Sequence, residues 1–473
     1  MNKEEANANL LDLYRQTRGI PPAAAGDDQQ TTAADQQPTL LDHHRAAAIA
    51  RFTALGGLPD DTEAYRHAPL LPVFARDYRL TTRPPAPSRR ARPFTCSVPG
   101  LDTHLCFTAN GWYTGRDGDD ELPPGITICS LAEAAARHPE LLQKHYEQHT
   151  RPGDFDSTVA LNTAFARDGL FIHVPDGITL DKPLQIINLA TGNRDTLAFQ
   201  RNLVILGRGA SATLLVCDHA LSDCRFLTNN LTEIALGDDA ALDYYQVQNR
   251  HADAALLNSL FITQASSSRL DANLITLYGG LTRNNIFVAL DGAGADCHLQ
   301  GMHLSDKTQC VDNFTSIDHR APRCRSNEHF KGVLDDAATA NFTGLITVRP
   351  AAAGTEAYLA NNNLLLADTA RVNTRPRLVI DTDDVKCTHG ATVGQLDDDA
   401  MFYLRSRGIG EDEARLMMIF GFTHEIVGRV RLEKLRDQID DLVDRRLRGQ
   451  WSKCYNCNPR CPSRETPETP DHA

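Results

Sequence analysis

The sequence predicts a mainly β fold, with one large all-β unit between two regions of helical pattern. From about residue 157 to residue 395, short apolar runs such as LFIHV, LVILG and ATLLVC are closed by Gly, Asp or Asn. Helical periodicity is almost absent here but returns on both sides. A sandwich, a propeller or a parallel β-helix could hold so many short strands. The simple alternation, with turn residues at the corners, fits a β-helix best.

A loose theme recurs inside this unit: a small or acidic turn is followed by alanine and then by a strand. The instances lie at 209–212, 237–240, 292–295, 335–338 and 367–370. Their spacing varies from about 28 to about 55 residues, so the sequence shows no strict repeat. The theme therefore supports stacked coils without defining the length of one coil.

The N-terminal region, residues 1–155, has the pattern of short helices. Residues 1–19 are expected to form one helix, and a second is expected over 39–56, where Gly56 and Gly57 would end it. The apolar face of this second helix is expected to hold Leu41, Ala48, Phe52 and Leu55.

Three other segments of this region differ in composition. Residues 21–38 carry no large apolar side chain, so they cannot offset their ordering entropy and are expected to be disordered. Residues 82–93, TRPPAPSRRARP, are expected to form a basic, proline-rich linker. Residues 131–148 have a helical pattern, in which Pro139 is expected to break or kink the helix.

After the β unit, which is assigned to residues 156–398, helical periodicity returns over 399–450. Segments 411–430 and 431–449 each carry a narrow apolar stripe opposite a charged face. They are interpreted either as a helical hairpin packed on the chain's own β unit or as a surface that docks a partner protein. The docking surface would use Phe422, Ile426, Leu432, Leu435, Ile439 and Leu442.

Length and composition exclude several classes of protein. The chain has 473 residues, 41% hydrophobic and 23% charged, and its net charge is −13. Nucleic acid and anionic lipid both attract a positive surface, so neither is an expected partner. No run of apolar residues is long enough to span a membrane. The N-terminus carries charges where a signal peptide has its apolar core, so a cytoplasmic location is expected.

The chain has twelve cysteines, and most are expected to be inert, buried side chains. The tail, residues 451–473, contains Cys454, Cys457 and Cys461 in the pattern C-x2-C-x3-C-P. This pattern resembles the runs that hold [4Fe–4S] clusters but lacks one cysteine. The three thiols are interpreted either as a metal or cluster site or as part of a flexible tail without function.

Residues 383–397, DDVKCTHGATVGQLD, carry a more specific signal. Cys387 and His389 are two residues apart, so on a strand their side chains share one face. A thiolate and an imidazole are suitable donors for iron or zinc. Two ligands do not close a metal site, so the remaining ligands must come from elsewhere in the chain or from a partner.

Motifs of common enzymes are missing from the sequence. It contains no nucleotide-binding glycine loop with its flanking strand and helix, no GxSxG elbow and no HExxH. Adjacent carboxylates such as Asp335-Asp336 would point to opposite faces of a strand, so a turn or solvated role is favoured. A β-helix carbohydrate-active enzyme, either a polysaccharide lyase or a hydrolase, nevertheless stays as the alternative.

Residues 383–422, DDVKCTHGATVGQLDDDAMFYLRSRGIGEDEARLMMIFGF, resemble the SufB/SufD family of iron–sulfur cluster assembly proteins. Their KC[ST]HGATVGxLD form is most like the SufD branch. The resemblance extends through 330–380 and 161–188 and, more weakly, through 50–70. It does not include residues 21–38 or the tail after about residue 450, so the tail cysteines inherit no role from it.

The resemblance implies a right-handed parallel β-helix between two helical regions. It also implies a non-catalytic scaffold subunit of the SUF iron–sulfur cluster assembly complex, which pairs with a SufB-like subunit and docks a SufC-like ATPase through its C-terminal helices. His389 matches the family histidine that takes part in nascent cluster assembly at the subunit interface, and Cys387 matches the adjacent cysteine.

No cofactor is expected to bind permanently, because the nascent iron–sulfur cluster would be transient and shared with the partner. A homodimer of this chain alone, acting as a carrier of iron or sulfur, is the remaining interpretation.

Overall fold

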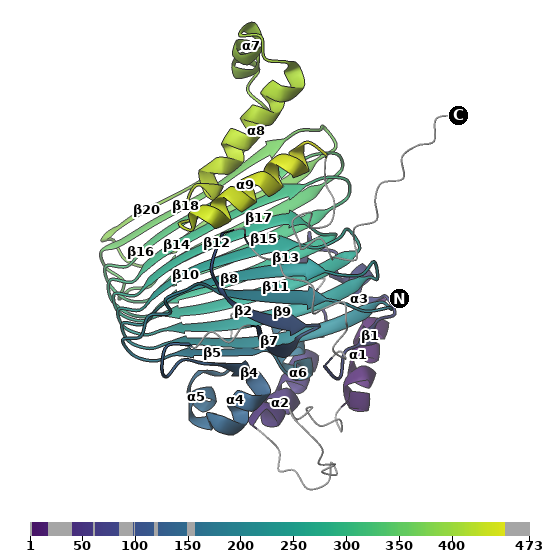
Figure 1. Ribbon diagram of the computed structural model, residues 1–473, viewed down its shortest axis with the longest axis vertical. Coiled ribbons are helices and arrows are strands. Elements are labelled where there is room, and N and C mark those ends of the chain that lie inside the picture. Colours follow the sequence, from purple (N-terminus) through teal and green to yellow (C-terminus); the bar gives the residue numbers. More distant parts are fainter. Residues whose placement is uncertain are drawn as a thin grey trace.

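The chain folds into two ten-stranded sheets that face each other, with helices at both ends of the sequence (Figure 1). The computed structural model describes residues 2–17, 40–59, 62–84, 98, 100–117, 122–148 and 157–449. The segment 21–38, most of the linker 82–93 and the tail 451–473 lie outside the described residues.

We call the two sheets A and B. Sheet A contains β4 (Thr127–Ser130), β5 (Leu170–Val174), β7 (Thr196–Leu206), β9 (Phe226–Leu236), β11 (Ala254–Gln264), β13 (Leu281–Leu290), β15 (Cys310–His319), β17 (Thr339–Val348) and β19 (Arg371–Ile380), and β1 (Arg79–Leu80) pairs with β7. Sheet B contains β3 (Trp112–Asp117), β2 (His104–Ala109), β6 (Leu184–Ala190), β8 (Ser211–Ala220), β10 (Ala241–Asn249), β12 (Arg269–Tyr278), β14 (Asp296–Ser305), β16 (Arg325–Leu334), β18 (Thr355–Leu365) and β20 (Val385–Gly394).

From β5 onward the chain alternates between the sheets, and each strand pairs in parallel with the strand two places later. One coil therefore consists of two strands and two corners. Thr196 lies opposite Phe226, and Thr339 lies opposite Arg371, so a coil takes up about 30 residues. This arrangement confirms the predicted parallel β-helix and excludes a sandwich or a propeller. Its first coil also receives β2 from the region before residue 155.

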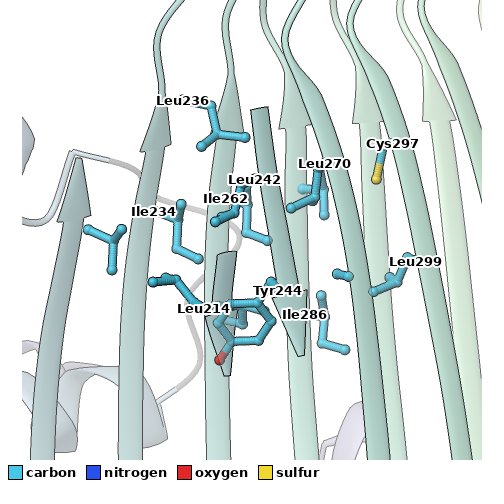
Figure 2. Close-up of a cluster of buried hydrophobic side chains, with 14 of the residues drawn as sticks. Leu214, Ile234, Leu236, Leu242, Tyr244, Ile262, Leu270, Ile286, Cys297 and Leu299 are labelled. Carbon is cyan, nitrogen blue, oxygen red and sulfur yellow. The ribbon is translucent and has the colours of Figure 1, made fainter. Parts of the chain in front are cut away.

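The core of the β-helix lies between the sheets, where the inward-facing side chains of successive coils stack on one another (Figure 2). Leu242, Leu270 and Cys297 form one such column, because each lies opposite the next in the register of sheet B. Side chains alternate along each strand, so every second residue joins a column of this kind. Burial of these columns removes apolar area from water coil by coil, as is typical of stacked repeats.

The irregular spacing of the turn theme has a structural explanation. The corners from sheet A to sheet B adopt positive φ once in each coil. Before the last corner, which joins β19 to β20, these residues are Gly177, Gly209, Asp239, Ser267, Gly294, Arg323 and Gly354. Three of the predicted instances lie at these corners, whereas 335–338 and 367–370 lie at the opposite corners, from sheet B to sheet A. The theme also missed the corners at Ser267 and Arg323, so its spacing did not reflect the coil length.

Short helices cover the N-terminal end of the β-helix and part of sheet A (Figure 1). They are α1 (Lys3–Thr17), α2 (Leu40–Ala54), η1 (Glu63–Tyr65), α3 (Leu70–Phe74), α4 (Leu131–Arg137), α5 (Pro139–His145) and α6 (Ser157–Phe165). The predicted helices over 1–19 and 39–56 are confirmed, and the break at Pro139 separates α4 from α5. Leu55 was expected on the apolar face of this helix with Leu41, Ala48 and Phe52, which are buried, but it follows the end of α2 and is 48% exposed.

A buried ion pair attaches these helices to sheet A. The Arg201 guanidinium on β7 donates to Glu233 Oε2 on β9 at 2.6 Å, and both side chains are fully buried. Arg201 also donates to Thr163 Oγ1 on α6 at 2.8 Å and lies 4.8 Å from the centre of the Tyr146 ring. One cation thus joins two strands and two helical segments.

Up to residue 449, where the described residues end, three helices follow the β-helix: α7 (Asp398–Ser406), α8 (Glu411–Val427) and α9 (Glu433–Leu447). Helices α8 and α9 pack on the outer face of sheet B, where Tyr245 accepts a hydrogen bond from the Arg431 backbone at 3.2 Å. Helix α7 stands clear of both sheets (Figure 1). Among the described residues, no helix is long and apolar enough to cross a membrane.

Candidate functional site at the open end of the β-helix

The candidate site lies where the β-helix ends. Within the described residues, β19 is the last strand of sheet A and β20 is the last strand of sheet B, and each is hydrogen-bonded to a strand on one side only. Inward-facing apolar residues at this end are therefore exposed: Ile380 by 40% and Val393 by 46%. We call this surface the open end.

Cys387 and His389 lie on β20, and both face the interior side of the β-helix. In the register of sheet B, Cys387 lies opposite Ala357 and His389 lies opposite Leu359. Ala357 and Leu359 are buried in the core, and paired residues of parallel strands share a face. The prediction that the two donors share one face is therefore confirmed. Cys387 is half-buried and His389 is exposed, since no further strand among the described residues pairs with β20.

The protonation of the thiol limits what this pair can do alone. Burial raises the pKa of the Cys387 thiol, and a hydrogen bond with the backbone of Ala357 offsets part of this effect. The thiol is therefore protonated at neutral pH, and a metal ion must displace this proton in order to bind. In the described part of the chain, no group of three or more His, Cys, Asp or Glu residues could hold a metal ion. Within these residues the pair is thus an incomplete ligand set.

Strand β19 contributes a further polar group to the open end. Thr374 lies opposite Phe342 of the core, so it faces inward like Cys387 and His389. Its hydroxyl oxygen is buried and has no hydrogen-bond partner among the described residues. The sequence reasoning missed Thr374, although alignment of TRPRLVI with FTGLITV one coil earlier would have placed it.

Two titratable groups lie in the core below the open end, and the sequence reasoning missed both. Glu328 is buried two strands below His389 in the same column, with Leu359 between them. Burial raises the pKa of Glu328 to about 8, although its hydrogen bond with Thr315 at 2.5 Å opposes the shift. The other carboxyl oxygen of Glu328 has no partner among the described residues.

His319 is the second of these groups. Burial lowers the pKa of His319 to about 4, and its Nε2 lies 2.9 Å from Ser326 Oγ. At neutral pH, Glu328 is thus largely a neutral carboxylic acid and His319 a neutral imidazole, so the core below the open end carries little charge.

The residues of the predicted docking surface lie mostly inside the chain's own fold. Ile426, Leu435 and Ile439 are buried against the outer face of sheet B, where they belong to one apolar cluster. The partly buried residues that pack on this cluster include Phe422, Leu432 and Leu442. Of the two interpretations of this stripe, the structure therefore favours a helical hairpin packed on its own β unit. Cys454, Cys457 and Cys461 lie outside the described residues.

A different part of the C-terminal region is exposed and apolar. Helix α7 has no buried residue, and Phe402 and Tyr403 are 74% and 57% exposed. Met417 on α8 is exposed as well. The sequence pattern does not single out α7, because the adjacent apolar stripe on α8 and α9 is longer and more regular.

Comparison with known families identifies the class of protein. The SufBD core domain of SUF system FeS cluster assembly matches residues 188–422, and the SufBD protein N-terminal region matches residues 26–186. The chain therefore belongs to the SufBD family, whose role is iron–sulfur cluster assembly by the SUF system. This membership replaces the alternative of a carbohydrate-active enzyme.

Individual relatives include SufD proteins. The chain is 32% identical to the iron–sulfur cluster assembly protein SufD of Escherichia coli over 294 residues, which cover 61% of this chain and 69% of that protein. It is 26% identical to SufD of Bacillus subtilis over 331 residues, 68% of this chain and 74% of that protein. A SufBD family protein of Synechocystis is 30% identical over 344 residues, 71% of this chain and 76% of that protein.

Proposed function

We propose that this chain is a non-catalytic scaffold subunit of a SUF assembly complex, located in the cytoplasm, whose open end pairs with a SufB-like subunit. The observation that carries the proposal is the open end itself, with Cys387 and His389 facing the space where a further coil would lie. A nascent iron–sulfur cluster would be cargo at this junction, and no permanently bound cofactor is required.

Two properties of the open end favour a β-strand partner. In the part of the chain that the structure describes, the outer edges of β19 and β20 pair with no strand, so their backbone N–H and C=O groups can pair with strands of another chain. Ile380 and Val393 expose apolar surface that a partner's coil would remove from water. Both sheets end together, so a partner that is itself a two-sheet β-helix end fits both edges at once.

The donor set gives the reason for placing assembly at this junction. Cys387 and His389 supply one sulfur and one nitrogen, which suit iron but leave its coordination incomplete. The inward-facing residues of a partner strand would lie about 4.8 Å from these side chains, one strand spacing away. The partner can therefore supply the missing ligands, and Thr374 can offer a hydrogen bond to a bound sulfide from the facing sheet.

A SufC-like ATPase is proposed to dock on the exposed apolar residues of α7 and α8 rather than on the predicted stripe. Phe402 and Tyr403 offer aromatic anchors, the residue type that dominates binding energy at protein interfaces. Met417 extends this surface onto α8. Ile426, Leu435 and Ile439 are instead proposed to hold α8 and α9 against sheet B.

The decisive experiment replaces His389. The His389→Ala variant is compared with Thr388→Ala, its neighbour on the same strand, whose side chain points to the opposite face. The chain is purified with its SufB-like and SufC-like subunits and reconstituted without oxygen with iron and sulfide. We expect His389→Ala to form the complex but to assemble much less cluster, and Thr388→Ala to match the wild type. Normal cluster yield from a folded His389→Ala complex would refute the role of this residue.

A further inference from the structure

A row of arginines lies on the outward face of β19, at the edge of sheet A. Arg371, Arg375 and Arg377 are all exposed, and they alternate with the inward-facing Thr374 and Leu378. The inward direction is fixed by register, because Thr374 and Leu378 lie opposite Phe342 and Ile346 of the core. The row is locally positive although the whole chain has a net charge of −13.

The chain itself neutralises little of this charge. Arg375 forms an ion pair with Glu63, and both side chains stay largely exposed. Arg371 donates to the backbone carbonyl of Asp368 at 3.2 Å and forms no ion pair with another described residue. Arg377 has no hydrogen bond or ion pair among the described residues, and its neighbour in the register is Leu345. The row therefore has positive charge available for a partner.

We propose that the arginine row selects the partner of the open end: a different protein chain whose pairing strand carries carboxylates on its outward face. This inference rests on the proposed function, in which a β-strand partner adds to β19 and β20. Side chains on the same face of neighbouring strands lie close together, so opposite charges there are favourable and like charges are not. The row lies on the face away from the cluster, so it contributes to partner choice and not to cluster chemistry.

A second copy of this chain would bring no carboxylates to the arginine row. If the two sheet A edges met, the arginine rows of both copies would lie on the same outer face. If β19 met β20 of the copy, it would face Lys386, Thr388 and Thr392 on the outward side of that strand, and none of them is acidic. Both end-to-end arrangements thus leave the arginines without carboxylates, whereas an acidic strand of another protein would pair with them. Charged edges are also a known barrier to self-association.

The test removes the charge and keeps the length of the side chains as far as the amino acids allow. In the full chain, Arg371, Arg375 and Arg377 are replaced together by Gln. The control replaces three exposed arginines far from the open end, Arg137, Arg194 and Arg208, and has the same net charge. Affinity for the SufB-like subunit from the same genome is measured at low and at high salt, and thermal unfolding verifies that both variants fold.

We expect the row variant to bind on the order of tenfold more weakly at low salt and to lose most of the salt dependence of binding. The control should keep the affinity and the salt dependence of the wild type. Unchanged affinity of the row variant, or an equal loss in the control, would overturn the inference.

Self-association is measured in parallel by sedimentation velocity and separates this inference from the proposed function. If the wild type fails to bind a SufB-like subunit at all, the proposed partner is refuted. In that case only self-association tests the arginine row. If the wild type is monomeric and the row variant forms dimers, the result supports partner selection by the row. Wild type and row variant in the same oligomeric state would overturn it.

Discussion

Glu328 gives the sharpest test of the interior of the β-helix, since it is a carboxyl group buried in an apolar core without a cation. Its pKa is raised from the ordinary value of 4.5 to about 8 by burial, and its partner is the Thr315 hydroxyl at 2.5 Å. We consider the variant Glu328→Gln, which keeps the size and planarity of the side chain but cannot ionise. The amide can still form the hydrogen bond with Thr315.

The sign of the effect follows from proton binding. Between about pH 4.5 and about pH 8, the folded chain holds a proton on Glu328 that the unfolded chain has lost. The free energy of unfolding therefore decreases as the pH rises through this range, and levels off above it. A shift of this size corresponds to a loss on the order of 5 kcal/mol. Glu328→Gln lacks this loss, so it should be the more stable protein near pH 8, by a few kcal/mol.

The assay is urea unfolding of both proteins at a series of pH values from about 5 to about 9. His319 contributes a separate pH dependence, because its pKa of about 4 lies below the ordinary value of 6.5. This contribution is lost as the pH falls from about 6.5 to about 4, and it is common to both proteins, so the difference between them isolates Glu328. Parallel stability curves, or a variant less stable than the wild type near pH 8, would refute the placement of Glu328 as a buried neutral acid.

Three further predictions concern the helices and the tail. Arg201→Met should lower the free energy of unfolding by about 3–5 kcal/mol, because the buried Glu233 carboxylate loses its ion-pair partner. The double variant with Glu233→Leu should recover much of this loss in the same urea assay. Leu435→Asp should destabilise the fold, and a stable Leu435→Asp protein would contradict the packing of α9 on sheet B. Phe402→Ser should leave the unfolding midpoint unchanged but weaken ATPase binding about tenfold. Replacement of Cys454, Cys457 and Cys461 by serine should leave assembly of the complex unchanged, as measured by gel filtration. Loss of the complex would show that the tail has a role in assembly.

The fold class was predictable because strand alternation is a local property of the sequence. The coil length was not, because the two corners of each coil use similar small and acidic residues. Asp239 and Asp336 both adopt positive φ, yet they lie at opposite corners of the β-helix. Only the hydrogen-bond register distinguishes the corners, and register is a long-range property.

The C-terminal stripe illustrates a second limit. Its apolar spacing correctly predicts that Leu435 and Ile439 are buried, but spacing alone cannot tell whether the covering surface belongs to the same chain. Sheet B provides that surface through Tyr245 and Ile275. The exposed aromatic residues of α7 do not belong to an apolar stripe at helical spacing, so the pattern that predicts buried helices does not indicate them.

The position of Cys387 and His389 follows from where the columns of the β-helix end. Below Cys387, the same column holds Ala357, and below His389 it holds Leu359, both buried. A metal-binding thiolate enclosed in an apolar column would carry a large desolvation cost, whereas the last coil lets both donors face solvent. The two donors thus lie at the ends of their columns, where a bound metal ion need not be enclosed by this chain's own core. A partner strand that continues sheet B would place its own inward-facing side chains about 4.8 Å from both donors. An incomplete pair in this chain is therefore sufficient, provided that the remaining ligands arrive with the strand that closes the end.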